Sequence, residues 1–225
     1  MDDYKSEFIE FMVRSGVLTF GDFVTKSGRQ TPYFINTGRF DTGRKIDRLG
    51  GFYARALSRH LGETFDCLFG PAYKGIPLVV ATSAALARDF GRDVGFAFNR
   101  KEIKDHGEGG ALVGCPLHPG HRVVIVEDVV TAGTSVRQCM PLLRAVGGVQ
   151  VRALIVAVDR QERGRGEHGA LAELRETYGI EAFAIATIDE IVHHLAGRSI
   201  DGRVVLDESM QERVAAYRRE HGVSA

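Results

Sequence analysis

The strongest chemical signal in the sequence is a pair of carboxylates followed by a turn of small residues. Residues 123–135 read Val-Val-Ile-Val-Glu-Asp-Val-Val-Thr-Ala-Gly-Thr-Ser. A small-residue turn at the start of a helix can surround a phosphate with backbone N–H groups, because unpaired donors and the helix dipole favour an anion. Glu127 and Asp128 precede the turn, where their oxygens can accept hydrogen bonds from a sugar diol. The alternative is a strand whose acidic end caps the next helix. The whole arrangement favours a sugar-phosphate site.

Two further segments supply positive charge for an anionic ligand. Residues 70–77 read Gly-Pro-Ala-Tyr-Lys-Gly-Ile-Pro, in which Lys74 offers a point charge beside exposed N–H groups. No Ser or Thr follows this lysine, so the segment is not a Walker loop. Residues 98–110 combine nearby glycines with potential cations, which favours a loop that closes over an anion and excludes water. These cations are Arg100, Lys101, Lys104 and His106. The alternative is a solvated, charged hairpin.

Three other patterns are weaker signals. Residues 164–169 satisfy G-x-G-x-x-G, but five polar residues separate the first glycine from the preceding strand, which disfavours a dinucleotide site. Cys115, His118 and His121 have spacings compatible with a metal, but proline and glycine make the segment look like a turn, and no fourth ligand is evident. His193 and His194 are adjacent in a probable helix and point apart, so we expect surface or packing roles.

Apolar runs predict the elements that position these segments. The first sixteen residues have helical apolar spacing, and residues 17–40 mix β-formers with turn residues, so about 1–40 should form a small N-terminal subdomain, a hood. The rest, about 41–225, alternates helix and strand, which predicts an α/β fold with a doubly wound, mostly parallel sheet flanked by helices. The predicted helices are residues 44–61, 76–90 and 135–146, and the strands are residues 65–69, 94–98, 122–127, 151–158 and 182–188. Ligands of such sheets bind beyond the carboxyl ends of the strands.

Composition sets limits on partners and compartment. The 225 residues favour a single main domain, and the 29 Lys and Arg residues equal the 29 Asp and Glu residues, so we expect no nucleic-acid partner. The start lacks the layout of a secretory signal, and no stretch approaches a membrane span, so we expect no membrane association. The three cysteines are scattered and odd in number, which favours free thiols in a reducing, cytoplasmic setting.

Residues 123–135 resemble the phosphoribosyl pyrophosphate (PRPP) motif of the type I phosphoribosyltransferases. Four more segments resemble orotate phosphoribosyltransferases. They are residues 26–36, residues 70–77, which are similar to the family's pyrophosphate loop, residues 98–110 almost residue for residue, and residues 158–164, which contain Arg160. Orotate enzymes more often carry Asp-Asp where this chain has Glu127 and Asp128. Taken alone, residues 26–36 would be interpreted as a turn and a core strand. The resemblance implies transfer of ribose 5-phosphate from PRPP to orotate, with release of pyrophosphate, in pyrimidine biosynthesis.

The resemblance also implies residue roles. Catalysis is expected to rest on Lys104, with Lys101, His106 and Asp128. The residues expected to bind PRPP are Lys26, Tyr73, Lys74, Arg100, Lys101, Lys104, His106, Glu127, Asp128, Val129, Val130, Thr131, Ala132, Gly133, Thr134 and Ser135. Those expected to bind orotate are Lys26, Phe34, Ile35, Thr131 and Arg160. Mg²⁺ is expected to be held mainly through PRPP and not directly by the protein. The family pattern further implies a non-proline cis peptide near Tyr73 and a homodimer in which residues 100–110 reach the neighbouring subunit's site.

Three rival functions are compatible with the PRPP motif. A phosphoribosyltransferase for another nucleobase would keep the phosphate and ribose contacts and differ in the base contacts. A PRPP-sensing regulator would keep the fold but bind nucleic acid instead of catalysing transfer. A non-catalytic interaction module would release no pyrophosphate. The balanced charge, the lack of an obvious helix-turn-helix segment and the complete cationic loop favour the enzyme.

Overall fold

A six-stranded sheet forms the centre of the protein in a computed structural model that describes residues 1–25, 28–102, 110–163, 166 and 168–223. Its strand order is β5-β4-β3-β6-β7-β8, and every neighbouring pair is parallel except β4 with β5. The strands are β3 (Cys67–Gly70), β4 (Gly95–Asn99), β5 (Leu112–Gly114), β6 (Arg122–Val129), β7 (Gln150–Asp159) and β8 (Glu181–Thr187). The predicted mostly parallel α/β sheet is therefore confirmed, with β5 as an additional antiparallel edge.

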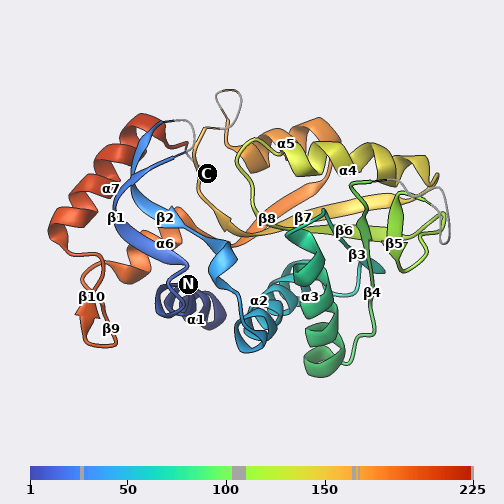
Figure 1. Ribbon diagram of the computed structural model, residues 1–225, viewed down its shortest axis with the longest axis horizontal. Coiled ribbons are helices and arrows are strands. Elements are labelled where there is room, and N and C mark those ends of the chain that lie inside the picture. The colour runs from blue at the N-terminus through green and yellow to red at the C-terminus, as the bar shows by residue number, and fades with distance from the viewer. Residues whose placement is uncertain (26–27, 103–109, 164–165, 167, 224–225) are drawn as a thin grey trace.

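Helices cover both faces of this sheet (Figure 1). The helices α4 (Thr134–Ala145) and α5 (Ala170–Tyr178) lie on one face, and α2 (Gly43–Leu61) and α3 (Gly75–Phe90) lie on the other. Side chains alternate accordingly along the buried strand β6: Val124 and Val126 join the core on the α2 side, whereas Val123 and Ile125 join the core on the α4 side. A strand buried on both faces is a continuous apolar run, which is why this segment is visible in the sequence.

The hood lies at one end of the sheet (Figure 1). It contains α1 (Asp3–Arg14), the antiparallel hairpin of β1 (Leu18–Val24) and β2 (Gln30–Ile35), and the short helix η1 (Thr37–Arg39). The C-terminal helix α7 (Glu208–His221) packs on β2, with the ring of Tyr217 5.7 Å from that of Tyr33. No sequence pattern predicted this role for the C-terminal tail.

Each predicted helix and strand agrees with an observed one to within two residues at each end, and the elements without a predicted range lie mainly in the last third of the chain. No range was predicted for α5, α6 (Ile188–Leu195), α7 or the small hairpin of β9 (Ser199–Ile200) and β10 (Arg203–Val204). The predicted helix around His193 and His194 corresponds to α6. The predicted strand 182–188 is displaced by one residue from β8 (Glu181–Thr187), because Thr187 and Glu190 form a capping box that starts α6 at Ile188. Within the described ranges, no helix has both the length and the apolar character needed to cross a membrane.

Candidate active site

The predicted phosphate turn lies at the carboxyl end of β6, before α4. Gly133 adopts φ +65°, and a Cβ there would lie 3.0 Å from a side-chain carbon of Leu174, so glycine suits both the backbone and the space. No side chain of the described residues caps the first turn of α4. A cavity of about 90 Å³ opens beside this helix start. It is lined by Glu127, Val129, Val130, Thr131, Gly133, Thr134, Ser135 and Val136. Ala132 lies within the same turn. This arrangement can bind an anion.

The acidic pair is buried directly before the turn. Glu127 is 5% exposed and Asp128 is 9% exposed. The backbone carbonyl of Glu127 accepts a hydrogen bond of 2.7 Å from the hydroxyl of Tyr53, which holds the end of β6 against α2. Burial, followed by the charge of Asp128, raises the pKa of Glu127 well above its ordinary range. Burial by itself would raise the pKa of Asp128 too, but hydrogen bonds from Lys74 and Thr37 lower it below the ordinary value.

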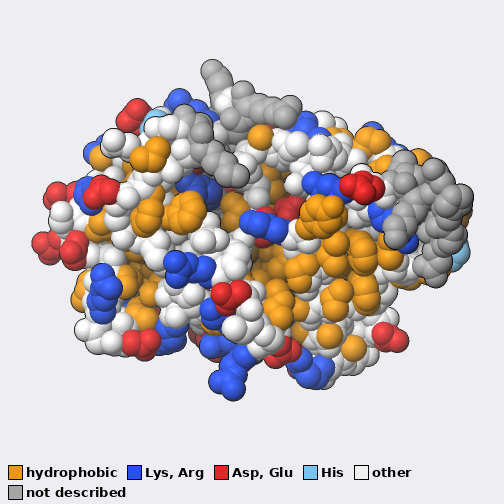
Figure 2. Space-filling view, viewed as in Figure 1, with side chains coloured by type: hydrophobic (Ala, Val, Ile, Leu, Met, Phe, Trp, Pro, Cys, Tyr) orange, Lys and Arg blue, Asp and Glu red, His pale blue; other side chains and the backbone are white. Residues whose placement is uncertain are grey.

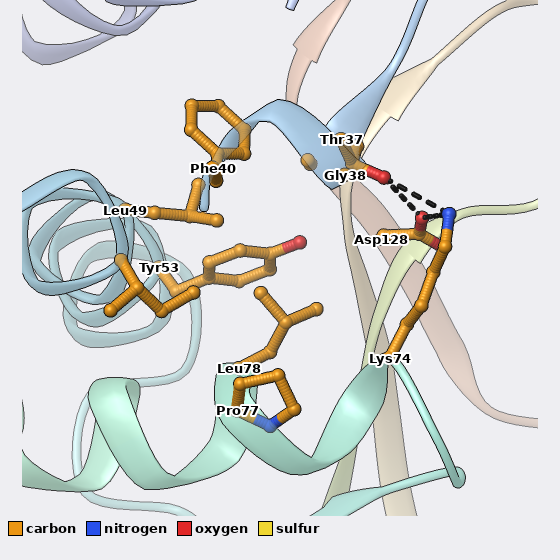
Figure 3. Close-up of a pocket in the computed structure, with 11 residues that line it drawn as sticks. Thr37, Gly38, Phe40, Leu49, Tyr53, Lys74, Pro77, Leu78 and Asp128 are labelled. Atoms are coloured by element: carbon orange, nitrogen blue, oxygen red, sulfur yellow. Dashed lines mark hydrogen bonds and ion pairs between the residues drawn. The ribbon is translucent and has the colours of Figure 1, made fainter. Parts of the chain in front are cut away.

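Two elements bring polar groups to the carboxylate of Asp128 (Figure 3). The Nζ of Lys74, just before α3, lies 2.7 Å from Oδ2 of Asp128, and Oγ1 of Thr37, in η1, lies 2.5 Å from the same oxygen. These groups close one end of a cavity of about 140 Å³ whose other walls are mostly apolar. The remaining walls are Gly38, Phe40, Ile46, Leu49, Tyr53, Pro77, Leu78 and Ala157. No local pattern in the sequence marks Thr37 or Tyr53, because both contact residues far away in the chain.

The segment 71–74 forms a tight loop between β3 and α3. The Ala72–Tyr73 peptide is cis, which confirms the cis peptide that the family resemblance implied. The N–H of Ala72 donates a hydrogen bond of 2.9 Å to the side-chain oxygen of Asn99 at the end of β4. The ring of Tyr73 is 68% exposed and lies 5.4 Å below the ammonium of Lys101. Lys74 of this loop and the neighbouring Lys101 are therefore exposed cationic side chains at the same edge of the sheet as the predicted phosphate turn.

The cationic loop is only partly described. Arg100 and Lys101 stand at its start, and the N–H of Arg100 bonds to the carbonyl of Ala111 at 2.8 Å, which closes the base of the loop. The predicted catalytic residues Lys104 and His106 lie outside the described residues. The same is true of Lys26, which was predicted to contact both substrates.

Phe34 and Ile35, two of the predicted base-binding residues, lie in the hood, Arg160 follows β7, and Thr131 lies in the turn before α4. The guanidinium of Arg160, just after β7, lies 4.9 Å from the ring centroid of Tyr33 and donates hydrogen bonds to Glu162. Phe34 is 40% exposed and stacks on Phe23, whereas Ile35 packs against the core. Neighbouring residues of a strand point to opposite faces, so Phe34 and Ile35 present their side chains to different sides of the hairpin.

The weaker sequence patterns acquire structural roles. Gly169 precedes α5 and forms a bridge with Arg163, while three residues of the glycine pattern lie outside the described ranges. The rings of His118 and His121 contact each other, and no trio of metal-binding side chains occurs within the described residues. His194 is buried and lies 3.3 Å from Glu10, as expected for a packing residue.

Comparisons with known proteins agree with this geometry. The family model of the phosphoribosyl transferase domain matches residues 36–190. The orotate phosphoribosyltransferase of Lachnoclostridium phytofermentans is 53% identical over 100% of both chains, and that of Clostridium acetobutylicum is 52% identical over 99% of this chain and 100% of its own. The crystal structure of the Francisella tularensis orotate phosphoribosyltransferase has a TM-score of 0.83 at 33% identity and covers 96% of this chain and 100% of that chain. The chain therefore belongs to the orotate phosphoribosyltransferases, within the phosphoribosyl transferase family.

Proposed function

We propose that the edge of the sheet formed by β3, β6 and β7 transfers ribose 5-phosphate from PRPP to orotate and releases pyrophosphate, a step of pyrimidine biosynthesis. The observation that carries this assignment is the convergence of an uncapped helix start, a buried acidic pair and Lys74 at that edge. The three groups match the three parts of PRPP, which are a phosphate, a sugar diol and a pyrophosphate.

Each part of the substrate then has a place. The 5-phosphate binds the turn 131–135, the ribose hydroxyls bind Glu127 and Asp128, and the pyrophosphate binds the loop at Tyr73 and Lys74 with the cations of residues 100–106. Orotate enters from the hood side, where Arg160 pairs with its carboxylate and Lys26, Phe34, Ile35 and Thr131 complete the base site. As the anomeric carbon loses pyrophosphate it gains positive character, while negative charge grows on the leaving oxygens. Lys104, with Lys101 and His106, stabilises that charge.

Mg²⁺ fits this site through the substrate. The described side chains offer a pair of carboxylates but no trio of ligands, and Oδ2 of Asp128 is already bonded to Lys74 and Thr37. This donor set suits an ion that takes most of its oxygens from pyrophosphate, with Glu127 and Asp128 nearby as carboxylates of the site. When bound, Mg²⁺ would neutralise part of the pyrophosphate charge.

A homodimer in which residues 100–110 cross to the partner's site completes the proposal. An apolar surface over α3 supports it, because Pro77, Val80, Ala84 and Ala87 are all exposed along one side of that helix (Figure 2). Such a surface favours association over exposure to water.

Free thiols at Cys67, Cys115 and Cys139 support a cytoplasmic location. Separation of cell fractions, followed by an activity assay, tests that location.

Mixing two inactive variants tests the shared loop. Lys104→Ala removes the loop cation and leaves the acidic pair, whereas Asp128→Asn does the reverse. In a mixed dimer with a crossing loop, one site combines the intact acidic pair with the intact loop, so unfolding and refolding the variants together should restore about one quarter of wild-type activity. No recovery in mixed dimers verified by mass would mean that each loop serves its own subunit.

The reaction is tested by pyrophosphate release from PRPP and Mg²⁺ with orotate, in parallel with uracil, adenine and hypoxanthine. Release with orotate alone is expected. Release with another base would preserve the PRPP site and overturn the roles of Lys26, Phe34 and Arg160. PRPP binding without any release would favour a sensing regulator.

A further inference from the structure

A charged cluster joins the base side of the site to the hood. The Oε1 of Glu162 accepts hydrogen bonds from Nη2 of Arg160 at 2.7 Å, from Nε of Arg160 at 3.1 Å and from the hydroxyl of Tyr33 at 2.6 Å. The Oε2 of Glu162 accepts one of 2.5 Å from Nη2 of Arg29. The side chains of Glu162 and Arg160 are only 9% and 12% exposed, so this cluster is largely screened from water.

Three hydrogen bonds of Gln161 fix the backbone turn directly before Glu162. Gln161, between Arg160 and Glu162, has φ +48°, a left-handed conformation that costs energy for a residue other than glycine. The turn is fixed because the N–H of Gln161 donates to Asp159 at 2.9 Å and its side-chain oxygen accepts from the N–H of Asp189 at 3.1 Å. Its carbonyl also accepts from the N–H of Val223, beyond α7, at 2.8 Å.

The strained turn at Gln161 brings the side chains of Arg160 and Glu162 together. Residues two apart in sequence, Arg160 and Glu162, meet through their side chains beside the ring of Tyr33. Strained backbone that is fixed by its surroundings is concentrated at functional sites. A turn needed only to connect β7 with the following segment would not require a buried carboxylate between two arginines.

We propose that Glu162 is a positioning residue that fixes the guanidinium of Arg160 for the carboxylate of the base. This inference rests on the proposed role of Arg160. Glu162 uses the Nε and Nη2 donors of Arg160, which leaves Nη1 and the second hydrogen of Nη2 outside the pair. A guanidinium can bind two carboxylates on different edges, and two parallel bonds from the free edge suit a planar carboxylate.

The charges of the cluster support the same role. Arg29 and Arg160 carry two positive charges and Glu162 carries one negative charge, so the cluster keeps one net positive charge for an anionic base. Burial would raise the pKa of Glu162, but the charge and hydrogen bonds of Arg160 lower it, so the side chain stays ionised. Loss of this carboxylate would leave two neighbouring arginines to repel each other, and Arg160 would turn away from its present position.

A double-mutant cycle tests the proposal in the full-length protein. The variants are Glu162→Gln, Arg160→Ala and the two together, with Asp22→Asn as a control that removes only an exposed ion pair with Arg213 on the outside of the hood. For each variant, kcat/KM for orotate, the KM for PRPP and the thermal unfolding midpoint are measured. We expect Glu162→Gln to reduce kcat/KM for orotate by about 100-fold, as displacement of a substrate-orienting group does, with the KM for PRPP within about twofold of wild type. The control should match wild type.

The cycle separates positioning from a structural role. If Glu162 acts through Arg160, adding Glu162→Gln to Arg160→Ala should cause no further loss of kcat/KM for orotate. Losses that multiply in the double variant, or an equal rise of both KM values, would overturn the proposal. An Arg160→Ala variant with wild-type kinetics would overturn the role of Arg160 as well, and wild-type protein that releases no pyrophosphate with orotate would overturn the proposed function itself.

Discussion

The ammonium of Lys74 lies 2.7 Å from Oδ2 of Asp128, so the cation expected at the pyrophosphate and the carboxylate expected at the ribose are bonded to each other across the site. Lys74 comes from the loop after β3 and Asp128 from the end of β6, two adjacent parallel strands whose carboxyl ends meet at one edge. PRPP, which carries both a diol and a pyrophosphate, would separate the two side chains by giving each its own partner.

Lys74→Ala should weaken PRPP binding. The variant lacks the charged donor that Lys74 is expected to offer to the pyrophosphate of PRPP, so we expect the KM for PRPP to rise about 10- to 100-fold. The KM for orotate should change much less. Steady-state kinetics with each substrate varied in turn checks this. Lys45→Ala is the matched control, because Lys45 pairs with Asp41 in an exposed position. Equal effects on both substrates would contradict the assignment of Lys74 to pyrophosphate.

Lys104→Ala should lower turnover far more than PRPP affinity. The lysine is expected to act on the charge that develops as pyrophosphate leaves, so its removal should reduce kcat by about 100-fold or more while the Kd for PRPP changes little. Single-turnover kinetics and a direct PRPP binding assay separate the two quantities. Wild-type turnover in this variant would remove the role assigned to Lys104.

Glu127→Gln should change how stability depends on pH. The native pKa of Glu127 is raised above the ordinary value of 4.5, so the folded protein holds a proton that the unfolded chain releases, and stability falls as pH rises from that value toward neutrality. The glutamine variant lacks this loss, and each pKa unit corresponds to about 1.4 kcal/mol. Urea unfolding at about pH 5 and about pH 7 should therefore show the variant gaining stability relative to wild type at the higher pH. A difference that is the same at both pH values would show that Glu127 titrates normally.

Asp66→Asn should destabilise the start of the sheet, with the opposite pH dependence. The side chain of Arg122 donates hydrogen bonds of 2.7 and 2.9 Å to the Asp66 carboxylate and lowers its pKa to about 2. This contribution is present above the ordinary value of 3.8 and is lost as pH falls toward about 2. Both side chains are more than a third exposed, so solvent screening limits the cost at neutral pH to about 1 kcal/mol. Urea unfolding should show the gap to wild type closing as the pH is lowered; a constant gap would contradict an electrostatic origin.

Tyr53→Phe should destabilise the protein and disturb the acidic pair. The fully buried hydroxyl of Tyr53 bonds to the carbonyl of Glu127 at 2.7 Å, so its loss should cost about 1 kcal/mol and raise the KM for PRPP. Tyr4→Phe is the matched control, because no partner of the buried Tyr4 hydroxyl is found among the described residues. That control should be as stable as wild type or more so. Equal unfolding free energies for both variants would show that the Tyr53 hydrogen bond contributes nothing.

Local patterns explain why the sheet was predictable. Residues buried on both faces of β6 and β7 form continuous apolar runs, and each run ends in polar residues at a turn, so the strands and the turn at Gly133 could be located from the sequence. The helix α7 could not be predicted from apolar periodicity, because its mostly polar sequence buries only Val214 and Tyr217, which are too few apolar residues to define a face.

The sequence by itself determined the α/β fold class, the small-residue turn at Gly133 and the acidic pair Glu127 and Asp128 before it, because periodicity, small residues and charge act over a few neighbouring positions. Only the tertiary structure decided which distant groups complete the site. Thr37 is 91 positions from Asp128, and Arg29 is 133 positions from Glu162, yet each pair is hydrogen-bonded. Such contacts depend on how the hood docks on the ends of the strands, and this packing leaves no local pattern in the chain.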